Sequence, residues 1–242
     1  LQGLYVDSRP YVFGFSDKFK VEAVRKLLEI RGGAEYILYY FTATGKTANR
    51  SGRDVTFDLT DDNFLPMPLN ERIINHLIGG YIETKITFKG LTVLPGFRND
   101  YFKRSGESTW DPRLLISYEF PSKTILSVAG GKYSYFFQTN PAYFDAYPQY
   151  AKIGKNLKSE WAFHRVAGIE QTLGLYKIKV EGFYNEFFDL ANRYVHFGPD
   201  WSIRETMNTG KIRAWGAEIL LTKDRKENQD DFFGWISYTC LL

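Results

Sequence analysis

Cysteine, long hydrophobic runs and charge of one sign are all scarce in this sequence, and each scarcity excludes a class of protein. The single cysteine, Cys240, can form no internal disulfide, so the fold does not rest on a disulfide framework. No run of 18 apolar residues occurs, which excludes a transmembrane helix. The 31 basic and 28 acidic residues leave a net charge of only +3, too balanced for a nucleic-acid-binding protein.

A signal peptide and a natural start are also missing. The first residues, LQGLYVDSRPYVFG, lack the basic and apolar regions that direct secretion, and the chain opens on Leu1. We therefore expect a processed or partial chain.

Motifs for catalysis or metal binding are absent as well. The stretch FTATGKT ends like a phosphate-binding loop but has Tyr40 where that motif needs glycine. The acidic cluster DLTDDN does not have the spacing of a calcium loop. The histidines have no close-spaced partners for a metal: they are His76, His164 and His196. The sequence predicts no enzyme, no cofactor and no metal site.

Aromatic residues are abundant, at 17% of the chain, and they favour β-structure. Between residues 110 and 120 apolar and polar residues alternate with the period of a strand. The apolar set is Leu114, Ile116, Tyr118 and Phe120; the polar set is Arg113, Ser117 and Glu119. The same alternation occurs at 76–88, 91–97, 123–135, 161–172, 176–184, 215–222 and 231–239. This pattern predicts an all-β, antiparallel protein with roughly ten strands.

The first third of the chain is less regular. Residues 34–43, AEYILYYFTA, are apolar on both faces. Residues 17–30, DKFKVEAVRKLLEI, fit an amphipathic helix and a strand equally well. Both interpretations stay open for that segment.

Connection lengths indicate which kind of sheet this is. Short turns are predicted at 88–90, 121–123 and 173–174, and longer connections at 102–107, 136–160 and 189–209. Tight turns at one end and longer loops at the other are typical of an up-and-down outer-membrane barrel. The runs are about the 9 to 11 residues that a membrane-crossing strand needs, longer than the roughly 5 to 6 of a soluble β-sandwich. The face of Leu114 and Ile116 is then predicted to meet lipid.

Five short phrases give the chain a family resemblance. They are Asp111-Pro112-Arg113, Gly131-Lys132-Tyr133, Gly168-Ile169-Glu170-Gln171, Gly182-Phe183-Tyr184-Asn185 and Gly234-Trp235-Ile236-Ser237-Tyr238. In this order they resemble the middle of the barrel of TonB-dependent outer-membrane receptors. The resemblance is clearest over 79–239, and 1–78 fits only loosely, so we interpret 1–242 as one partial barrel domain.

The resemblance implies a transporter in the bacterial outer membrane. Such receptors take up a scarce ligand, for example a ferric siderophore, cobalamin or an oligosaccharide, with energy from the TonB complex acting on a plug. Outer-membrane lipid, lipopolysaccharide and a small-molecule ligand are the implied partners. The alternatives are a smaller complete barrel, such as a porin or adhesin, and a soluble β-sandwich binding module.

Several features of the family are not found in the sequence. A plug, a TonB box and a terminal aromatic residue are missing, and a barrel that holds a plug has about 22 strands. Either the chain is a fragment of a longer receptor, which we favour, or other chains or segments complete the barrel.

Aromatic residues supply the predicted ligand site. The stretch 133–150, YSYFFQTNPAYFDAYPQY, offers ring faces to sugars, catecholates or cations, or else packs as an interfacial girdle. Its candidates are Tyr133, Tyr135, Phe136, Phe137, Tyr143, Phe144, Tyr147 and Tyr150. A second predicted loop adds Arg193, His196, Trp201 and Arg204, for an anionic siderophore or for lipopolysaccharide phosphates. Predicted girdle residues near strand ends are Tyr101, Phe102, Phe120, Tyr133, Tyr135, Tyr176 and Tyr184.

Overall fold

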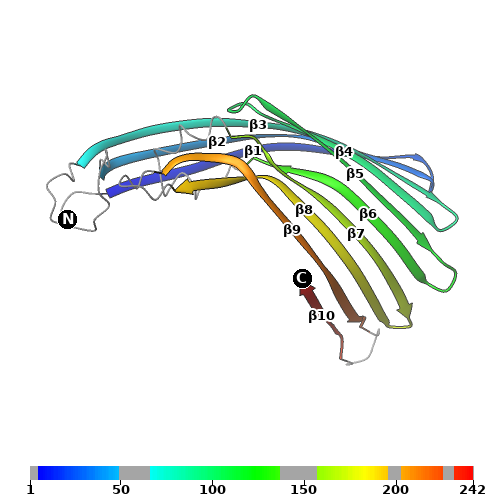
Figure 1. Cartoon of the computed structure of the whole chain (residues 1–242). Helices are drawn as coiled ribbons and strands as arrows, with labels where there is room; N and C mark the ends of the chain where they lie inside the picture. Colours follow the sequence, from blue (N-terminus) through cyan, green and yellow to red (C-terminus); the bar gives the residue numbers. More distant parts are fainter. Residues whose placement is uncertain (1–4, 49–65, 137–156, 196–202, 226–231, 242) are drawn as a thin grey trace.

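A computed structural model describes residues 5–48, 66–136, 157–195, 203–225 and 232–241. These residues form one curved, ten-stranded antiparallel sheet (Figure 1). The first five strands are β1 (Tyr5–Val24), β2 (Leu28–Ala48), β3 (Pro66–Phe88), β4 (Leu91–Phe102) and β5 (Glu107–Glu119). The others are β6 (Thr124–Tyr135), β7 (Glu160–Leu173), β8 (Tyr176–Val195), β9 (Ile203–Lys223) and β10 (Gly234–Leu241).

The strands follow one another across the sheet in chain order, as an up-and-down meander. Within the described ranges β1 and β10 do not pair with each other, so the sheet is an open arc with two edges. A single sheet rules out the two packed sheets of a β-sandwich for this part of the chain. The predicted all-β antiparallel class and the number of strands are confirmed.

Residues 17–30, for which helix and strand both fitted, form the hairpin of β1 and β2. Phe19 pairs with Gly32, and the turn closes with Leu27 N–H donating to Val24 C=O at 3.0 Å. Periodicity alone did not decide between the two states, because the segment satisfies both patterns. Pairing with the neighbouring strand decides in favour of the strand, because the backbone N–H and C=O groups on that side find hydrogen-bond partners there.

The β1–β2, β3–β4, β5–β6 and β7–β8 connections lie at one end of the sheet, hereafter the turn end, and the opposite end is the loop end. The β3–β4 turn has φ of 46° at Lys89 and 86° at Gly90, the left-handed pair of a two-residue hairpin. Lys123 and Gly174 also have positive φ, at 65° and 60°. The predicted turns at 88–90, 121–123 and 173–174 are therefore confirmed.

Two predicted long connections differ in the structure. The segment 102–107 is a tight turn, in which Gly106 N–H donates to Phe102 C=O at 3.0 Å. Much of 189–209 is strand, because β8 continues to Val195 and β9 begins at Ile203. The polar composition of the second segment is typical of a loop. Strands that extend beyond the hydrocarbon layer meet water on both faces, so they do not need to alternate apolar and polar residues.

The two faces of the sheet differ in polarity and in exposure. In β5 the even residues are exposed and mainly apolar, with Leu114 at 43% and Ile116 at 37%, whereas Asp111 and Thr109 are buried. Side chains spread apart on the convex side of a curved sheet and crowd together on the concave side. The apolar face is therefore convex and the polar face concave.

The apolar face continues from strand to strand. Cross-strand partners point to the same side of a sheet, and Tyr118, Leu126, Ile169, Val180 and Ile219 form one such row. A continuous exposed apolar surface marks contact with lipid or protein. No helix in the described part of the chain is long and apolar enough to cross a membrane.

Candidate functional site

Charged residues gather on the concave, polar face of β2 to β5. The Arg98 guanidinium bonds to the carboxylates of Glu35 and Asp100, the latter at 2.7 Å between Nε and Oδ2. Arg113 lies 4.0 Å from Glu83, measured from Nη1 to Oε1. The Arg98–Glu35 pair joins β4 to β2 and the Arg113–Glu83 pair joins β5 to β3, so these two pairs help to fix the register of the concave face, whereas Arg98 and Asp100 lie in the same strand.

Glycines on the same face make room for these side chains. A Cβ at Gly131 would lie 2.8 Å from the Cβ of Arg113, and one at Gly96 would lie 2.9 Å from its Cγ. A Cβ at Gly79 would lie 2.2 Å from Asp100 Oδ1. Glycine is the residue that allows a neighbour to approach this closely. The concave face thus alternates large charged residues with glycines from strand to strand.

Several polar atoms on the concave face have no hydrogen-bond partner among the described residues. They are Asn75 Oδ1, Asp100 Oδ1, Arg113 Nε and Asn185 Oδ1. A buried polar atom left unpaired costs stability, so native proteins almost always satisfy such atoms. The concave face therefore has the chemistry of a surface that meets water or another polar surface.

Side chains tie the strands together at the loop end. Asp111 accepts hydrogen bonds from Ser134, at 3.0 Å from the backbone N and 2.6 Å from Oγ. Glu107 accepts two hydrogen bonds from Ser159, one from the backbone N and one from Oγ, each at 2.7 Å. In the turn before Glu107, burial lowers the pKa of Arg104, which still keeps its charge because the ordinary pKa of arginine is far above neutral. The rim is thus polar and cross-linked.

Tyr133 and Tyr135 lie at the end of β6 and not in a loop, with Phe136 directly after them. Tyr133 packs on His164, with ring centroids 4.9 Å apart, and the Arg113 guanidinium lies 5.2 Å from its centroid. Because Tyr133 pairs with Ala162 in the concave row, its ring lies on the wall of the arc. Tyr133 and Tyr135 remain 43% and 47% exposed and so are accessible to a ligand.

The girdle prediction is wrong for some of these aromatic residues. Phe102 is fully buried on the concave face, stacked on Phe136 with centroids 5.0 Å apart. Tyr133 and Tyr135 share that face. Position near a strand end did not reveal the face, which depends on the register of each strand with its neighbour. Tyr101, Tyr176 and Tyr184, in contrast, are exposed on the apolar face.

The remaining predicted site residues are only partly placed. Arg193 pairs with Thr206 inside the β8–β9 ladder, and Arg204 lies in β9, so both belong to strands and not to a loop. Outside the described residues lie Phe137, Tyr143, Phe144, Tyr147, Tyr150, His196 and Trp201. The aromatic ligand site thus stays a prediction.

Sequence reasoning placed Arg113 on the polar face but named none of the charged residues of the concave face as site candidates. Arg98 and Asp100 occupy polar positions in the alternation of β4. Charged residues on the polar face of a membrane strand were the signal that could have identified them. Their partner Glu35 lies in the first third of the chain, where the pattern gave no register.

Comparison with known proteins agrees with this geometry. The family model for the TonB dependent receptor-like β-barrel matches residues 10–239. A search of curated proteins finds no match. Many solved structures are similar in fold, and three of them illustrate the low sequence identity.

The siderophore receptor PirA from Pseudomonas aeruginosa is 17% identical, with a TM-score of 0.66 over 97% of this chain and 41% of that one. The outer membrane transporter YddB from Escherichia coli is 12% identical, with a TM-score of 0.67 over 98% of this chain and 34% of that one. The FrpB iron transporter from Neisseria meningitidis is 16% identical, with a TM-score of 0.67 over 90% of this chain and 35% of that one.

The chain therefore spans well under half the length of these similar structures. An open meander of ten strands, with exposed apolar residues on its convex face and charged residues on its concave face, fits an arc of such a barrel. The sheet and the family match lead to one conclusion: this chain belongs to the TonB-dependent receptor β-barrel family of the bacterial outer membrane.

Proposed function

We propose that the chain forms part of the wall of an active importer energised through TonB. The observation that carries the proposal is the concave face, with its charged network and its unpaired polar atoms at Asp100, Arg113 and Asn185. A wall that met only bulk water would not need a network that spans four strands. A polar domain held inside the barrel, such as a plug, would supply partners for these atoms.

The rest of the barrel is part of the same proposal. An arc with free edges at β1 and β10 leaves backbone N–H and C=O groups unpaired, which lipid does not tolerate. Further strands, from the same polypeptide or from a partner, would pair with both edges. Residues 1–242 are then one partial barrel domain.

For the ligand we propose a ferric siderophore, with cobalamin and oligosaccharides as competing classes. The support is the aromatic and cationic chemistry of the wall near the loop end, where Tyr133, His164 and Arg113 lie together. Rings and a guanidinium suit the aromatic groups and negative charge that many iron chelates carry. The structure of PirA is named for a siderophore receptor and that of FrpB for an iron transporter.

The test is uptake of radiolabelled ferric siderophore, cobalamin and oligosaccharide by cells in which this receptor is the only route. We expect accumulation of the ferric siderophore that disappears when TonB is deleted. Accumulation that is equal with and without TonB would overturn the proposal in favour of a passive pore.

Variants of the wall test the ligand site. Replacing Tyr133 and Tyr135 with Ala should lower uptake several-fold at unchanged receptor level, because the rings that face the lumen are lost. Tyr118→Ala removes a ring from the apolar face and serves as the matched control. Removal of Tyr143, Tyr147 and Tyr150 tests the loop in the same assay, and unchanged uptake would refute its role.

A further inference from the structure

β8 and β9 both bend near the loop end, at an irregular stretch of the ladder that joins them (Figure 1). Regular pairing of β8 stops at Phe187 and resumes at Leu190, shifted by one residue. Between them Asp189 has a φ of 54°, a left-handed conformation that is uncommon for a residue other than glycine. This is a β-bulge, which bends the strand that carries it. The outer arms of the two strands, defined as residues 188–195 and 203–210, begin at this bulge.

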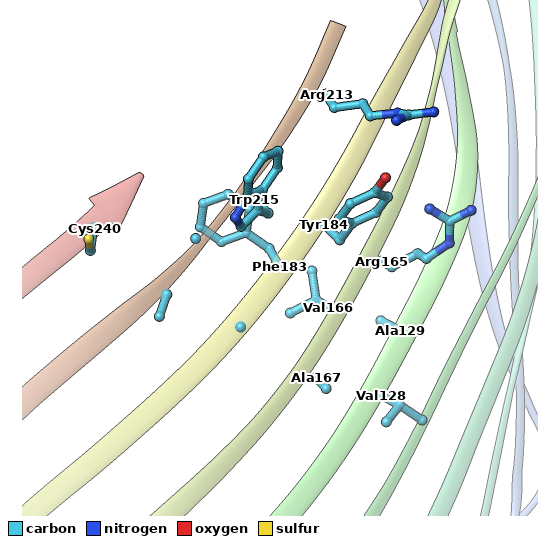
Figure 2. Close-up of a pocket in the computed structure, with 13 residues that line it drawn as sticks. Val128, Ala129, Arg165, Val166, Ala167, Phe183, Tyr184, Arg213, Trp215 and Cys240 are labelled. Atoms are coloured by element: carbon cyan, nitrogen blue, oxygen red, sulfur yellow. The ribbon is translucent and has the colours of Figure 1, made fainter. Parts of the chain in front are cut away.

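An ionic bridge joins three strands just below the bulge, on the convex face. The Glu186 carboxylate lies 2.9 Å from Arg165 Nη1 of β7 and 3.5 Å from Arg213 Nε of β9. Figure 2 shows Arg165 and Arg213 on their strands, with Tyr184 of β8 between them, at the border of a depression of about 1010 Å³. The inner parts of β7, β8 and β9 are therefore fixed to one another where the bend begins.

The side chain of Asn208 in β9 reaches past β8 to the chain that enters β7. Asn208 Oδ1 accepts a hydrogen bond from Lys158 N–H at 2.8 Å, and Nδ2 donates to Lys158 C=O at 3.1 Å. Nδ2 also donates to the C=O of Asp189 at 2.6 Å. Both N–H groups and the oxygen of the amide are thus in use. Because β8 lies between β7 and β9, this amide joins strands that are not neighbours.

Two carboxylates add further ties at the bulge. Glu160 Oε1 accepts a hydrogen bond from Ala191 N–H at 2.7 Å, and Asp189 Oδ2 accepts one from Trp161 Nε1 at 2.9 Å. The Trp161 ring stacks on Phe188, with centroids 4.2 Å apart. Hydrogen bonds to charged groups are stronger than those between neutral groups. The bend is therefore braced from β7 and does not act as a free hinge.

The same entry segment is tied to β5 on its other side. Ser159, which is buried, donates its backbone N–H and its hydroxyl to the carboxylate of Glu107, the first residue of β5. β6 lies between β5 and β7 in the sheet but ends at Tyr135. Lys158 and Ser159 thus connect β9 on one side with β5 on the other, through side chains that bond to the backbone.

We propose that Lys158 and Ser159 form a link that couples the outer arms of β8 and β9 to the β4–β5 turn, so that the two move as one body. Asn208 and Glu107 are the positioning residues, one at each end of the link. Glu107 and Glu160 belong to concave rows, so the link holds the outer arms toward the lumen. A contact that displaces the arms is then transmitted to β5. The inference does not rest on the proposed uptake function.

The test is hydrogen exchange of the full receptor in detergent, followed by mass spectrometry. In Asn208→Ala, peptides that cover Lys158 and the outer arms should exchange about tenfold faster, because three hydrogen bonds are lost. In Glu107→Ala, at the far end of the link, the outer arms should also exchange faster. That transmission is what coupling requires. Unchanged exchange of the outer arms in Glu107→Ala would overturn the proposal.

The matched control is Asn99→Ala at the same end of the sheet. Asn99 Nδ2 donates to Ser108 Oγ at 2.9 Å and to Thr109 C=O, but only between the neighbouring strands β4 and β5. Exchange of the outer arms should equal that of the unchanged receptor. An increase as large as in Glu107→Ala would indicate general loosening of the rim and would also overturn the coupling.

A double variant separates one shared link from two independent contacts. In Asn208→Ala/Glu107→Ala the effects on the outer arms should be less than additive, because either substitution alone breaks the link. Fully additive effects would contradict the proposal. Asn208→Asp keeps the size and the acceptor but loses the Nδ2 donor, so a smaller increase is expected there. Heat-modifiable migration of each variant in electrophoresis confirms that its barrel is folded.

Discussion

At the scale of single residues, close packing on the concave face depends on glycines beside charged side chains. Gly131 is the clearest example, because three atoms of β5 surround the position of its absent side chain. A Cβ there would lie 2.8 Å from Arg113 Cβ and 3.2 Å from both Arg113 Cα and Pro112 O. Backbone atoms and a Cβ cannot rotate away, so the two strands would have to separate.

We predict that Gly131→Ala destabilises the barrel by about 1–3 kcal/mol, the usual cost of overpacking. The measurement is the free energy of unfolding of the receptor by urea in detergent. Gly130→Ala is the matched control, since its Cβ would lie 3.5 Å from the nearest atom, an ordinary contact, and its effect should stay within about 0.5 kcal/mol. Equal effects of the two substitutions would contradict the steric argument.

Arg98 bridges two carboxylates, and its loss leaves both without their cation. The side chains of Arg98 and Asp100 are 27% and 10% exposed. We predict that Arg98→Met costs about 1–3 kcal/mol in the same unfolding measurement, less than the roughly 3–5 kcal/mol of a fully buried pair because water reaches this one.

Lys123→Met is the control for Arg98→Met. The pair of Lys123 with Glu119 is 69% and 50% exposed, and such surface pairs contribute within about 0.5 kcal/mol. A similar loss of stability in both variants would show that the bridge around Arg98 carries no special weight.

The same ion pairs show the limit of sequence-based prediction at this scale. Arg98 and Glu35 are 63 residues apart in the chain, and only the pairing of Glu35 with Gly79 and of Gly79 with Asp100 brings them together. That register depends on where the β2–β3 and β3–β4 pairings begin. The type of residue was readable from the sequence, whereas its partner was not.

At the scale of strands, alternation predicted some elements well and others poorly. β5 was readable because Leu114, Ile116 and Tyr118 alternate with polar residues and a Pro-Ser-Lys turn follows. β1 was not, because the segment from Asp17 fits a helical period too. β8 and β9 are longer than predicted, because the alternation is lost toward their ends near the loops.

The two faces of β5 give a direct test of which one meets lipid. We predict that Ile116→Lys lowers the stability of the inserted barrel, by up to about 2–4 kcal/mol if the residue lies at the bilayer midplane. Ser117→Lys places the same charge on the concave face and should have little effect on insertion. The measurement is unfolding in lipid bilayers, and the reverse order of the two effects would exchange the faces.

At the scale of the whole molecule, β1 and β10 are the edges of an arc and not the seam of a closed barrel. Among the described residues, each presents one row of backbone N–H and C=O groups that no other strand pairs with. In a bilayer such groups must find partners, because lipid supplies none. The number of strands and, through the family resemblance, a partial barrel were predictable from the sequence, and the order in which the strands pair gives the open edges directly.

We therefore predict that residues 1–242, expressed alone, form no stable monomeric barrel. The chain should associate through its edges in detergent and run as broad, large species in size-exclusion chromatography. Hydrogen exchange should be fast along the outer edges of β1 and β10 and slow in β7, whose backbone groups are paired on both sides. The expected effect of adding the missing strands, as the full polypeptide, is protection of both edges. A monodisperse, heat-modifiable monomer of 242 residues would instead indicate a small complete barrel and would contradict the assignment of this chain to an arc of a larger one.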